Sequence, residues 1–280
     1  MTNSMTNRIA PQKRFSQNFL TDNRTAAKIA AVLEASTDDL VLEIGPGTGA
    51  LTKHLVALPS RRIVAVDLDP RAVEAISGMV QQSGGRLSVQ LGDVLKVRLD
   101  DMFADVPTTN RRVIGNIPYA ITSEILFWLF EARTSMARAV IMMQKEVALR
   151  CVAKPGTKDY GVLTVAAWYA TTPKLMFTVQ PGSFFPRPSV TSAVVRFDMR
   201  TEVPPVPFAP FMSFVRAAFS QRRKVMANAL ASWANQQGIA LRTVTLPEHL
   251  SVTTLRAEAL SPDRLVELYL NLTKPENQPA

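Results

Sequence analysis

Short apolar runs alternate with amphipathic stretches along the first 145 residues of the chain. Short, mostly apolar segments occur at residues 41–44, 63–66, 87–91, 113–114 and 139–143. Such runs are typical of strands that are buried on both faces. Between them, apolar residues at helical spacing predict helices over residues 25–34, 51–58, 70–79 and 123–130. This alternation predicts a doubly wound α/β domain built on a parallel sheet.

The pattern changes in the later part of the chain. Apolar stretches at residues 174–179 and 193–197 are separated by a proline-rich segment instead of a helix, which predicts an antiparallel pair at the sheet edge. The segment Val203–Pro207 cannot continue a strand or a helix because of its prolines. We therefore expect a first domain over residues 1–203 and a small helical domain over residues 207–280. The helices predicted in the second domain lie at residues 211–230, around Leu255 and at residues 262–270.

The composition is that of a globular protein. Of the 280 residues, 47% are hydrophobic and 20% are charged, which excludes the disordered, collagen-like and coiled-coil classes. No apolar run approaches the roughly 18 residues of a membrane span, and the polar N-terminus has no secretory h-region. The single cysteine, Cys151, excludes an intramolecular disulfide, and the two histidines form no hydrolase or metal-binding pattern. We expect a cytoplasmic protein with no membrane or metal partner.

The chain is basic, and its excess charge is unevenly distributed. The formal net charge is +9. Residues 141–200 alone contribute +5, since eight basic residues there oppose three acidic ones. A basic surface attracts polyanions and speeds their encounter with the protein. Nucleic acid is therefore the leading class of partner.

A basic face is predicted on the first helix of the C-terminal domain. At about 100° per residue, Arg216, Arg223 and Lys224 fall on one arc and the apolar side chains on the other. Residues 211–224 include four basic residues and no acidic one, which suits the tracking of RNA phosphates. Arg222 falls inside the apolar arc, where we expect a specific partner or the end of the helix.

A glycine-rich loop follows the first of the buried strands. Its sequence is Glu43-Ile44-Gly45-Pro46-Gly47-Thr48-Gly49, and its glycines permit a tight turn and close approach of a ligand to the backbone. With Ala50 the loop also fits the dinucleotide-binding pattern G-x-G-x-x-A. Pro46, however, removes a backbone N–H that a pyrophosphate would use. The loop predicts a nucleotide-type pocket and favours a ligand without phosphate.

Acidic side chains follow the next two strands. Asp67 lies some 20 residues beyond the glycines, where a carboxylate can accept hydrogen bonds from a ribose diol. Asp69 is an alternative for that contact, although its position before Pro70 also suits a helix cap. Asp93 suits an adenine amino group or a solvated turn. Open α/β sheets bind ligands at the carboxyl ends of their strands, so several such residues in series favour a binding site.

The fourth strand runs into Asn116-Ile117-Pro118-Tyr119. The Asn116 side-chain oxygen and the Ile117 carbonyl, held before a proline, can together accept both hydrogens of an exocyclic amino group. The adjacent Tyr119 offers a ring on which a base can stack. This segment therefore predicts a site that orients an aromatic amine.

Three further stretches are distinctive: Lys13-Arg14-Phe15-Ser16-Gln17-Asn18-Phe19-Leu20, Gly182-Ser183-Phe184-Phe185-Pro186-Arg187-Pro188-Ser189-Val190 and Phe219-Ser220-Gln221-Arg222-Arg223-Lys224. Together with the glycine-rich loop, the strand-end aspartates and the Asn116 segment, they resemble the S-adenosylmethionine-dependent ribosomal RNA adenine N6-dimethyltransferases, most closely the bacterial small-subunit (16S) members. The resemblance covers nearly the whole chain. It implies a Rossmann-like methyltransferase sheet with a small C-terminal helical domain.

The resemblance also implies which residues bind the cofactor. Asn18 and Leu20 contact its methionine end, and Gly45 contacts the methionine or sulfonium region. Asp67 binds the ribose and Asp93 the adenine. The family usually has glutamate where Asp67 stands, which keeps Asp69 as the alternative.

For the target base, the resemblance implies that Asn116 contacts both the amino acid part of the cofactor and the target amine. Tyr119 and Phe184 stack on the two faces of an adenine that is unpaired or flipped out of its helix. The RNA itself lies on basic residues of the C-terminal domain: Arg216, Arg222, Arg223 and Lys224.

The expected reaction is transfer of methyl groups from S-adenosylmethionine to N6 of two adjacent adenosines in the 3′-terminal hairpin loop of 16S ribosomal RNA, each being dimethylated. The expected partner is the immature small ribosomal subunit, and we expect the chain to act as a monomer. The alternatives are a large-subunit methyltransferase of the antibiotic-resistance type, an assembly factor whose binding role dominates, and a nicotinamide-dependent oxidoreductase.

Overall fold

A computed structural model describes residues 18–241 and 244–274. The chain divides into two compact units, one formed by residues up to 148 with 171–199, the other by residues 149–170 with those from 200 onward. The change of unit after residue 199 falls close to the predicted boundary near residue 203. The prediction did not include residues 149–170 in the C-terminal unit, where the structure groups them. In the described part of the chain, no helix is long and apolar enough to cross a bilayer.

The first unit is built on a seven-stranded sheet with the order β4-β3-β2-β5-β6-β9-β7. Its strands, together with the short pair β1 and β8, are β1 (Phe19–Leu20), β2 (Leu40–Ile44), β3 (Arg62–Asp67), β4 (Leu87–Leu91), β5 (Arg111–Asn116), β6 (Arg138–Gln144), β7 (Thr171–Val179), β8 (Phe184–Phe185) and β9 (Ser192–Met199). Strands β4, β3, β2, β5 and β6 are parallel, and β9 pairs antiparallel with both β6 and β7. The predicted parallel sheet and its antiparallel edge pair are therefore confirmed.

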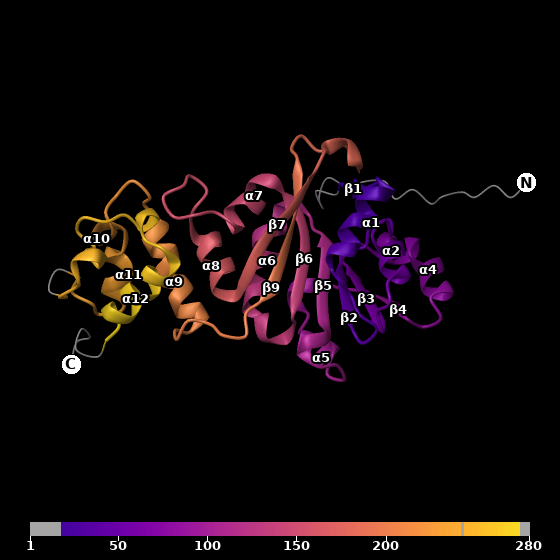
Figure 1. The fold of residues 1–280 in the computed structure, drawn as a ribbon, viewed down its shortest axis with the longest axis horizontal. Helices are drawn as coiled ribbons and strands as arrows, with labels where there is room; N and C mark the ends of the chain where they lie inside the picture. Colours follow the sequence, from indigo (N-terminus) through magenta and orange to yellow (C-terminus); the bar gives the residue numbers. More distant parts are fainter. Residues whose placement is uncertain (1–17, 242–243, 275–280) are drawn as a thin grey trace, which may run out of the picture. The chain divides into compact units, whose positions relative to one another are not determined.

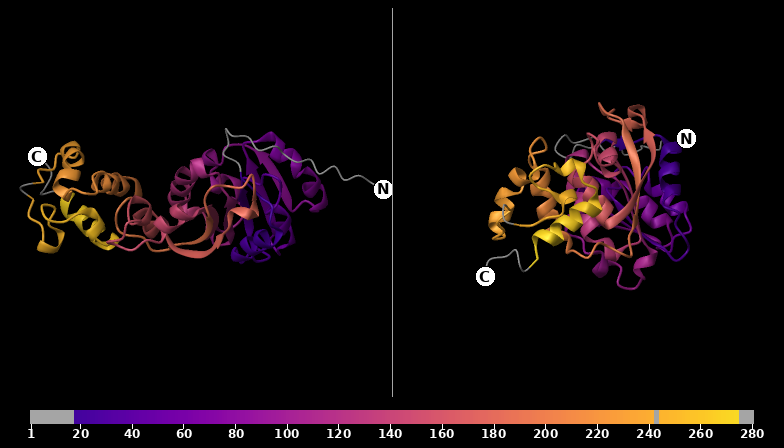
Figure 2. Two further views of the ribbon diagram at one scale, coloured as in Figure 1. Left: turned by 90° about the horizontal axis from the view of Figure 1, so that it is seen from above. Right: turned by 60° about the vertical axis from the view of Figure 1, so that its left-hand side comes forward.

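Helices cover both faces of this sheet (Figures 1 and 2). The helices of the chain up to residue 151 are α1 (Asn23–Val32), α2 (Thr52–Ala57), α3 (Pro70–Ala75), α4 (Ser77–Gln82), α5 (Leu99–Met102), α6 (Thr122–Glu131) and α7 (Lys145–Cys151). Asp22 begins α1 as a side-chain cap for Arg24 and Thr25. One buried cluster joins Ile29 and the adjacent Leu33 to Val41 and Ile114 of the sheet. The core thus lies where the apolar runs meet the amphipathic helices.

Strands β1 and β8 were not predicted. They pair antiparallel, with Phe19 opposite Phe185 and Leu20 opposite Phe184. Two-residue strands carry no detectable period, so a local pattern cannot identify them. Their pairing joins segments that are about 165 residues apart and forms a wall beside the end of the sheet (Figure 1).

The second unit is helical. Its helices are α8 (Val162–Ala170), α9 (Phe208–Phe219), α10 (Met226–Ala229), α11 (Ala231–Gln236) and α12 (Pro262–Leu272). Aromatic rings from four of them form its core: Tyr169, Phe211, Phe214, Trp233 and Tyr269. Helix α8 was not predicted, because nearly all of its side chains are apolar and give no amphipathic period.

The predicted helix over residues 211–230 is wrong in its length, and no α-helix forms around Leu255. Helix α9 begins at Phe208 and ends at Phe219, and Val225 is extended before α10 begins. The Ser220 hydroxyl donates to the Ala217 carbonyl at 2.7 Å, a local bond that competes with helix propagation. The four charged or polar residues that follow have no apolar side chain to hold them on the core. The basic segment is therefore a turn.

Candidate functional site

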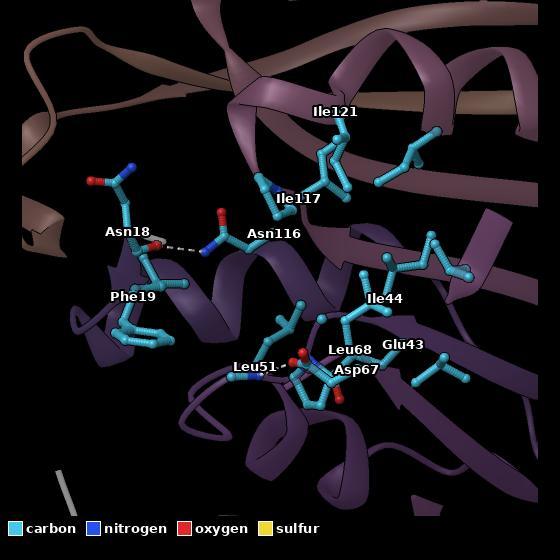
Figure 3. Close-up of a pocket in the computed structure, with 18 of the residues that line it drawn as sticks. Asn18, Phe19, Glu43, Ile44, Leu51, Asp67, Leu68, Asn116, Ile117 and Ile121 are labelled. Carbon is cyan, nitrogen blue, oxygen red and sulfur yellow. Dashed lines mark hydrogen bonds between the residues drawn. The ribbon is translucent and has the colours of Figure 1, made fainter. Parts of the chain in front are cut away.

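A cavity lies at the carboxyl ends of β2, β3, β4 and β5, with β1 as an additional wall (Figure 3). The glycine-rich loop, Asp67, Asp93 and the Asn116 segment all line it, as do Asn18 and Leu20. The convergence of successive strand ends follows from the parallel sheet. The predicted cofactor residues are thus brought together in one place.

The glycine-rich loop has a conformation that other residues rarely adopt. Gly45 and Gly47 have φ angles of +66° and +53°, in the left-handed region that glycine occupies without strain. A Cβ added at Gly47 would lie 3.0 Å from the Phe19 ring. The loop therefore packs closely against Phe19 of β1, and both the loop and β1 line the cavity.

Asp67 and Asp69 have different roles in the structure. Asp67 lines the cavity, and its carboxylate accepts hydrogen bonds from the backbone N–H of Gly47 at 3.2 Å and of Asp69 at 2.9 Å. Burial raises the pKa of the Asp67 carboxyl, and these hydrogen bonds oppose the shift. Asp69 is 2% exposed, caps α3 and pairs with Arg71 at 2.6 Å. Of the two alternatives, only Asp67 faces the cavity.

Asp93 combines the two interpretations that the sequence left open. One of its carboxylate oxygens accepts a hydrogen bond from the Leu95 backbone at 3.0 Å and caps the 3₁₀ turn Val94–Lys96. The residue also lines the cavity. A cap that holds the carboxylate in place is compatible with a ligand contact through its other oxygen.

Asn116 is the last residue of β5, and its amide has a fixed orientation. The Asn116 Nδ2 donates to the Asn18 backbone carbonyl at 3.1 Å (Figure 3). Because the amino group is used in this way, Oδ1 is the atom left to accept a hydrogen bond from a ligand. Among the described residues, none donates a hydrogen bond to that oxygen. Asn18 therefore takes part in the site through its backbone, which its sequence position alone did not indicate.

Tyr119 stands beside Asn116 and is held by its hydroxyl. The Tyr119 hydroxyl and the Ser192 hydroxyl are hydrogen-bonded at 2.6 Å, and the half-buried ring lines the cavity. Burial raises the pKa of the Tyr119 phenol, and the bond to Ser192 opposes this shift. The phenol stays neutral, so Tyr119 presents an uncharged ring and no base.

Phe184 is placed differently from the expectation that its ring stacks on a target base. It is 5% exposed and belongs to the core cluster with Leu20. Successive side chains of a strand point to opposite faces, and the exposed ring is that of the next residue, Phe185, at 64%. Stacking by Phe184 would require its ring to leave the core.

Glu43 is a site residue to which the sequence assigned no role. It lies within β2, is 1% exposed and lines the cavity. Burial raises the pKa of the Glu43 carboxyl to about 8, with a smaller contribution from nearby Asp67. Its Oε2 has no hydrogen-bond partner in the described part of the chain. The available signal was an acid inside an otherwise apolar strand, directly before the glycine-rich loop.

The cavity is acidic although the protein is basic. Three carboxyl side chains line it, those of Glu43, Asp67 and Asp93, and no lysine, arginine or histidine does so among the described residues. A buried carboxyl with an unpartnered oxygen favours a cationic ligand, because a positive charge offsets the cost of ionising it. S-adenosylmethionine carries a sulfonium and an ammonium group, so these residues fit it. The pyrophosphate of a dinucleotide would be repelled by these three acids, and Pro46 has no backbone N–H to donate to it.

The predicted RNA-binding residues lie at and beyond the end of α9. Arg216 is exposed on the helix, and Arg222, Arg223 and Lys224 are exposed in the turn that follows it. Arg222 donates to the Lys158 carbonyl at 2.8 Å and pairs with Glu258 at 3.2 Å. Both a helix end and a specific partner occur here, as the sequence predicted for Arg222.

The chain is similar to known proteins over most of its length. A family model described as ribosomal RNA adenine dimethylase matches residues 9–260. The ribosomal RNA small subunit methyltransferase A of Salinibacter ruber is 41% identical over 264 residues, which cover 94% of this chain and 85% of the relative. The protein of the same name from Chlorobium phaeobacteroides is 40% identical over 261 residues, covering 93% and 91%.

Solved structures give the same result. A dimethyladenosine transferase from Plasmodium falciparum has a TM-score of 0.76 and 26% identity, covering 90% of this chain and 96% of that one. The 23S rRNA methyltransferase ErmE has a TM-score of 0.64 and 27% identity, covering 92% and 100%. The fold is thus the Rossmann-like fold of methyltransferases. With a family model that spans most of its length and relatives about 40% identical, the chain belongs to the ribosomal RNA adenine dimethylase family.

Proposed function

We propose that this chain transfers methyl groups from S-adenosylmethionine to N6 of two adjacent adenosines in the 3′-terminal hairpin loop of 16S ribosomal RNA, dimethylating each during assembly of the small subunit in the cytoplasm. The observation that carries the proposal is the pairing of an acidic cavity with Asn116, whose amide is oriented to accept from an amine. One feature suits the cationic methyl donor and the other suits the acceptor.

The carboxyl groups have separate tasks around the donor. Asp67, fixed by two backbone N–H groups, accepts hydrogen bonds from the ribose hydroxyls. Asp93 accepts one from the adenine amino group. Glu43, at the floor of the cavity, ionises when the cationic donor lies beside it and then supplies a negative charge. S-adenosylmethionine, when bound, supplies a methyl group on a positively charged sulfur, which is already activated for transfer.

The acceptor is held by backbone and amide oxygens. Asn116 Oδ1 and the Ile117 carbonyl accept the two N6 hydrogens of an adenine, which directs the nitrogen lone pair toward the donor. The Tyr119 ring supports one face of the base. Since the leaving group is activated, alignment and electrostatic support suffice and no strong base is needed. The neutral Tyr119 phenol agrees with this, and the proton of the methylated nitrogen leaves to water.

The exposed basic residues of the second unit bind the RNA backbone. Arg216, Arg223 and Lys224 contact phosphates. Arg222 instead holds the turn to Lys158 and Glu258, although its exposed face can also reach a phosphate. The small-subunit substrate is favoured by relatives about 40% identical that are named ribosomal RNA small subunit methyltransferase A.

The test is a methylation assay with the purified chain and isotopically labelled S-adenosylmethionine. Immature small subunits and naked large-subunit ribosomal RNA are offered separately, and dimethyladenosine is located by mass spectrometry. We expect label at two adjacent adenosines of the small-subunit RNA, and none with Asn116→Ala. Label on the large-subunit RNA alone would contradict the substrate assignment. If Asn116→Ala supports subunit assembly as well as wild type does while failing to methylate, the chain acts mainly as an assembly factor.

A further inference from the structure

The exposed segment Phe185–Val190 has the chemistry of a nucleic-acid contact. Phe185 is the most exposed aromatic side chain among residues 18–241 and 244–274, with 64% of its surface accessible. Val190, in the same segment, is 40% exposed. Arg187 stands between them, exposed and outside any ion pair formed by the described residues. An exposed ring with a nearby cation is typical of proteins that stack single-stranded bases and pair with their phosphates.

This segment is anchored to the catalytic cavity at both ends. On one side, the backbone N–H of Thr21 donates to the Ser183 carbonyl at 2.8 Å, next to β1. On the other, the Ser192 hydroxyl is bonded to Tyr119, and the Lys145 backbone donates to the Thr191 carbonyl at 2.9 Å. Both β1 and Tyr119 line the cavity. The segment is therefore fixed at its ends, while the side chains of Phe185 and Val190 are exposed to solvent.

Phe185 lies close to the acceptor side of the cavity. It is the register partner of Phe19 in the β1–β8 pair, and Phe19 follows Asn18, whose carbonyl holds Asn116. Paired Cα atoms and one peptide step place the Phe185 backbone no more than about 9 Å from that of Asn18. A base that neighbours the adenosine at Asn116 is within reach at this distance.

We propose that Phe185 stacks on the base next to the adenosine held at Asn116, and that Arg187 pairs with its phosphate. This inference rests on the proposed function and extends it. With two adjacent target adenosines, the base at Phe185 is the second adenosine while the first is methylated. The ring at position 185 then favours RNA in which the two targets are consecutive and unpaired.

The test is a cycle between the protein and the RNA. Two kinds of RNA hairpin are used: one carries both adenosines, and in the other either adenosine is replaced by an abasic residue. Wild type and Phe185→Ala are each measured for affinity to both kinds of hairpin and for methylation of the remaining adenosine. Stacking predicts that wild type loses about tenfold in affinity on at least one abasic hairpin. Phe185→Ala should bind the intact RNA about tenfold more weakly than wild type does, and should bind that abasic hairpin no more weakly than it binds the intact RNA. Phe185→Trp should restore the wild-type affinity for the intact RNA.

Leu270→Ala removes another exposed apolar side chain, from α12, and is the control that should change none of these values. Additive losses in the cycle, or full affinity of Phe185→Ala for intact RNA, would overturn the inference and leave the proposed function standing. If wild type methylates no hairpin and no subunit, the proposed function fails and this inference fails with it.

Discussion

At the scale of single residues, the site combines an oriented amide with a buried acid. The Asn116 amide is turned by one hydrogen bond to the Asn18 carbonyl, so a backbone atom selects which end of the side chain meets the ligand. Glu43 is kept nearly free of solvent with one oxygen unpartnered. The unpartnered oxygen of Glu43 costs stability in the free protein, and a cationic ligand offsets that cost when it binds.

The orientation of the Asn116 amide can be tested with an isosteric change. In Asn116→Asp, the carboxylate cannot donate to the Asn18 carbonyl, and two oxygens face each other. We expect the rate of methyl transfer to fall about 100-fold or more, as for loss of one preorganised polar group, in single-turnover assays. Asn235→Asp, at an exposed position of α11, is the matched control and should retain the wild-type rate. An unchanged rate in Asn116→Asp would contradict the assigned orientation.

The raised pKa of Glu43 predicts a pH-dependent stability. The folded pKa of about 8 lies above the ordinary glutamate value of 4.5, so between these pH values the folded state binds a proton that the unfolded state has lost. The free energy of unfolding of wild type relative to Glu43→Gln therefore falls by up to about 1.4 kcal/mol per pH unit as pH rises from about 5 to 8. Urea unfolding of both proteins without cofactor measures this difference. A difference independent of pH would show that Glu43 ionises normally.

At the scale of elements, the sheet places the site and the loops complete it. The register of β2 with β5 pairs Ile44 with Gly115, one residue before Gly45 of the glycine-rich loop and one before Asn116. The two halves of the site thus share one pair of neighbouring strands. The basic segment shows the opposite case, since its structure as a turn depends on contacts made by Ser220 and Arg222 and not on helical periodicity.

Gly115 tests the close approach of these two strands. A Cβ at this position would lie 2.8 Å from the Ile44 carbonyl oxygen, a backbone atom that cannot move without disturbing the ladder. We expect Gly115→Ala to lower the free energy of unfolding by about 1–3 kcal/mol and to lower methylation. Gly78→Ala is the control: it lies in exposed α4 with no atom near the added Cβ. It should raise stability by about 0.5–1 kcal/mol, and equal effects of the two changes would contradict the packing argument.

At the scale of the whole molecule, charge is divided between functions. The chain carries a net charge of +9, yet the cavity is lined by acids. A basic exterior attracts RNA, while the acidic cavity attracts a cationic donor. One surface cannot attract both an anionic RNA and a cationic donor. Basic residues of the exterior therefore serve the RNA, and the carboxyl groups of the cavity serve the donor.

The exterior charge predicts a salt-dependent RNA affinity. Removing one phosphate-binding side chain should reduce the slope of log affinity against log salt concentration by about 0.7–0.9. The double change Arg223→Ala with Lys224→Ala should reduce it by about twice that amount and weaken binding to all RNA sequences alike. Arg24→Ala, an exposed arginine on α1, should leave the slope unchanged. A slope unaltered by the double change would remove these residues from the RNA-binding surface.

Much of this protein was determined by the sequence alone. The alternation of apolar runs and helical periods predicted the parallel sheet, its antiparallel edge pair and the strand ends that line the cavity, because strand and helix periods are local properties. Motifs on those strand ends predicted the family and its cofactor. The roles of the individual site residues and the monomeric state stay predictions.

The tertiary structure decided what depends on contacts between distant segments. It assigned Asp69 to a helix cap and Asp67 to the cavity, buried Phe184 while exposing Phe185, and ended α9 at Phe219. It also grouped residues 149–170 with the C-terminal unit. Burial of a side chain and the partner of a hydrogen bond are set by residues up to about 165 positions away, as in the β1–β8 pair. A local sequence pattern cannot predict such distant neighbours, because only folding brings them into contact.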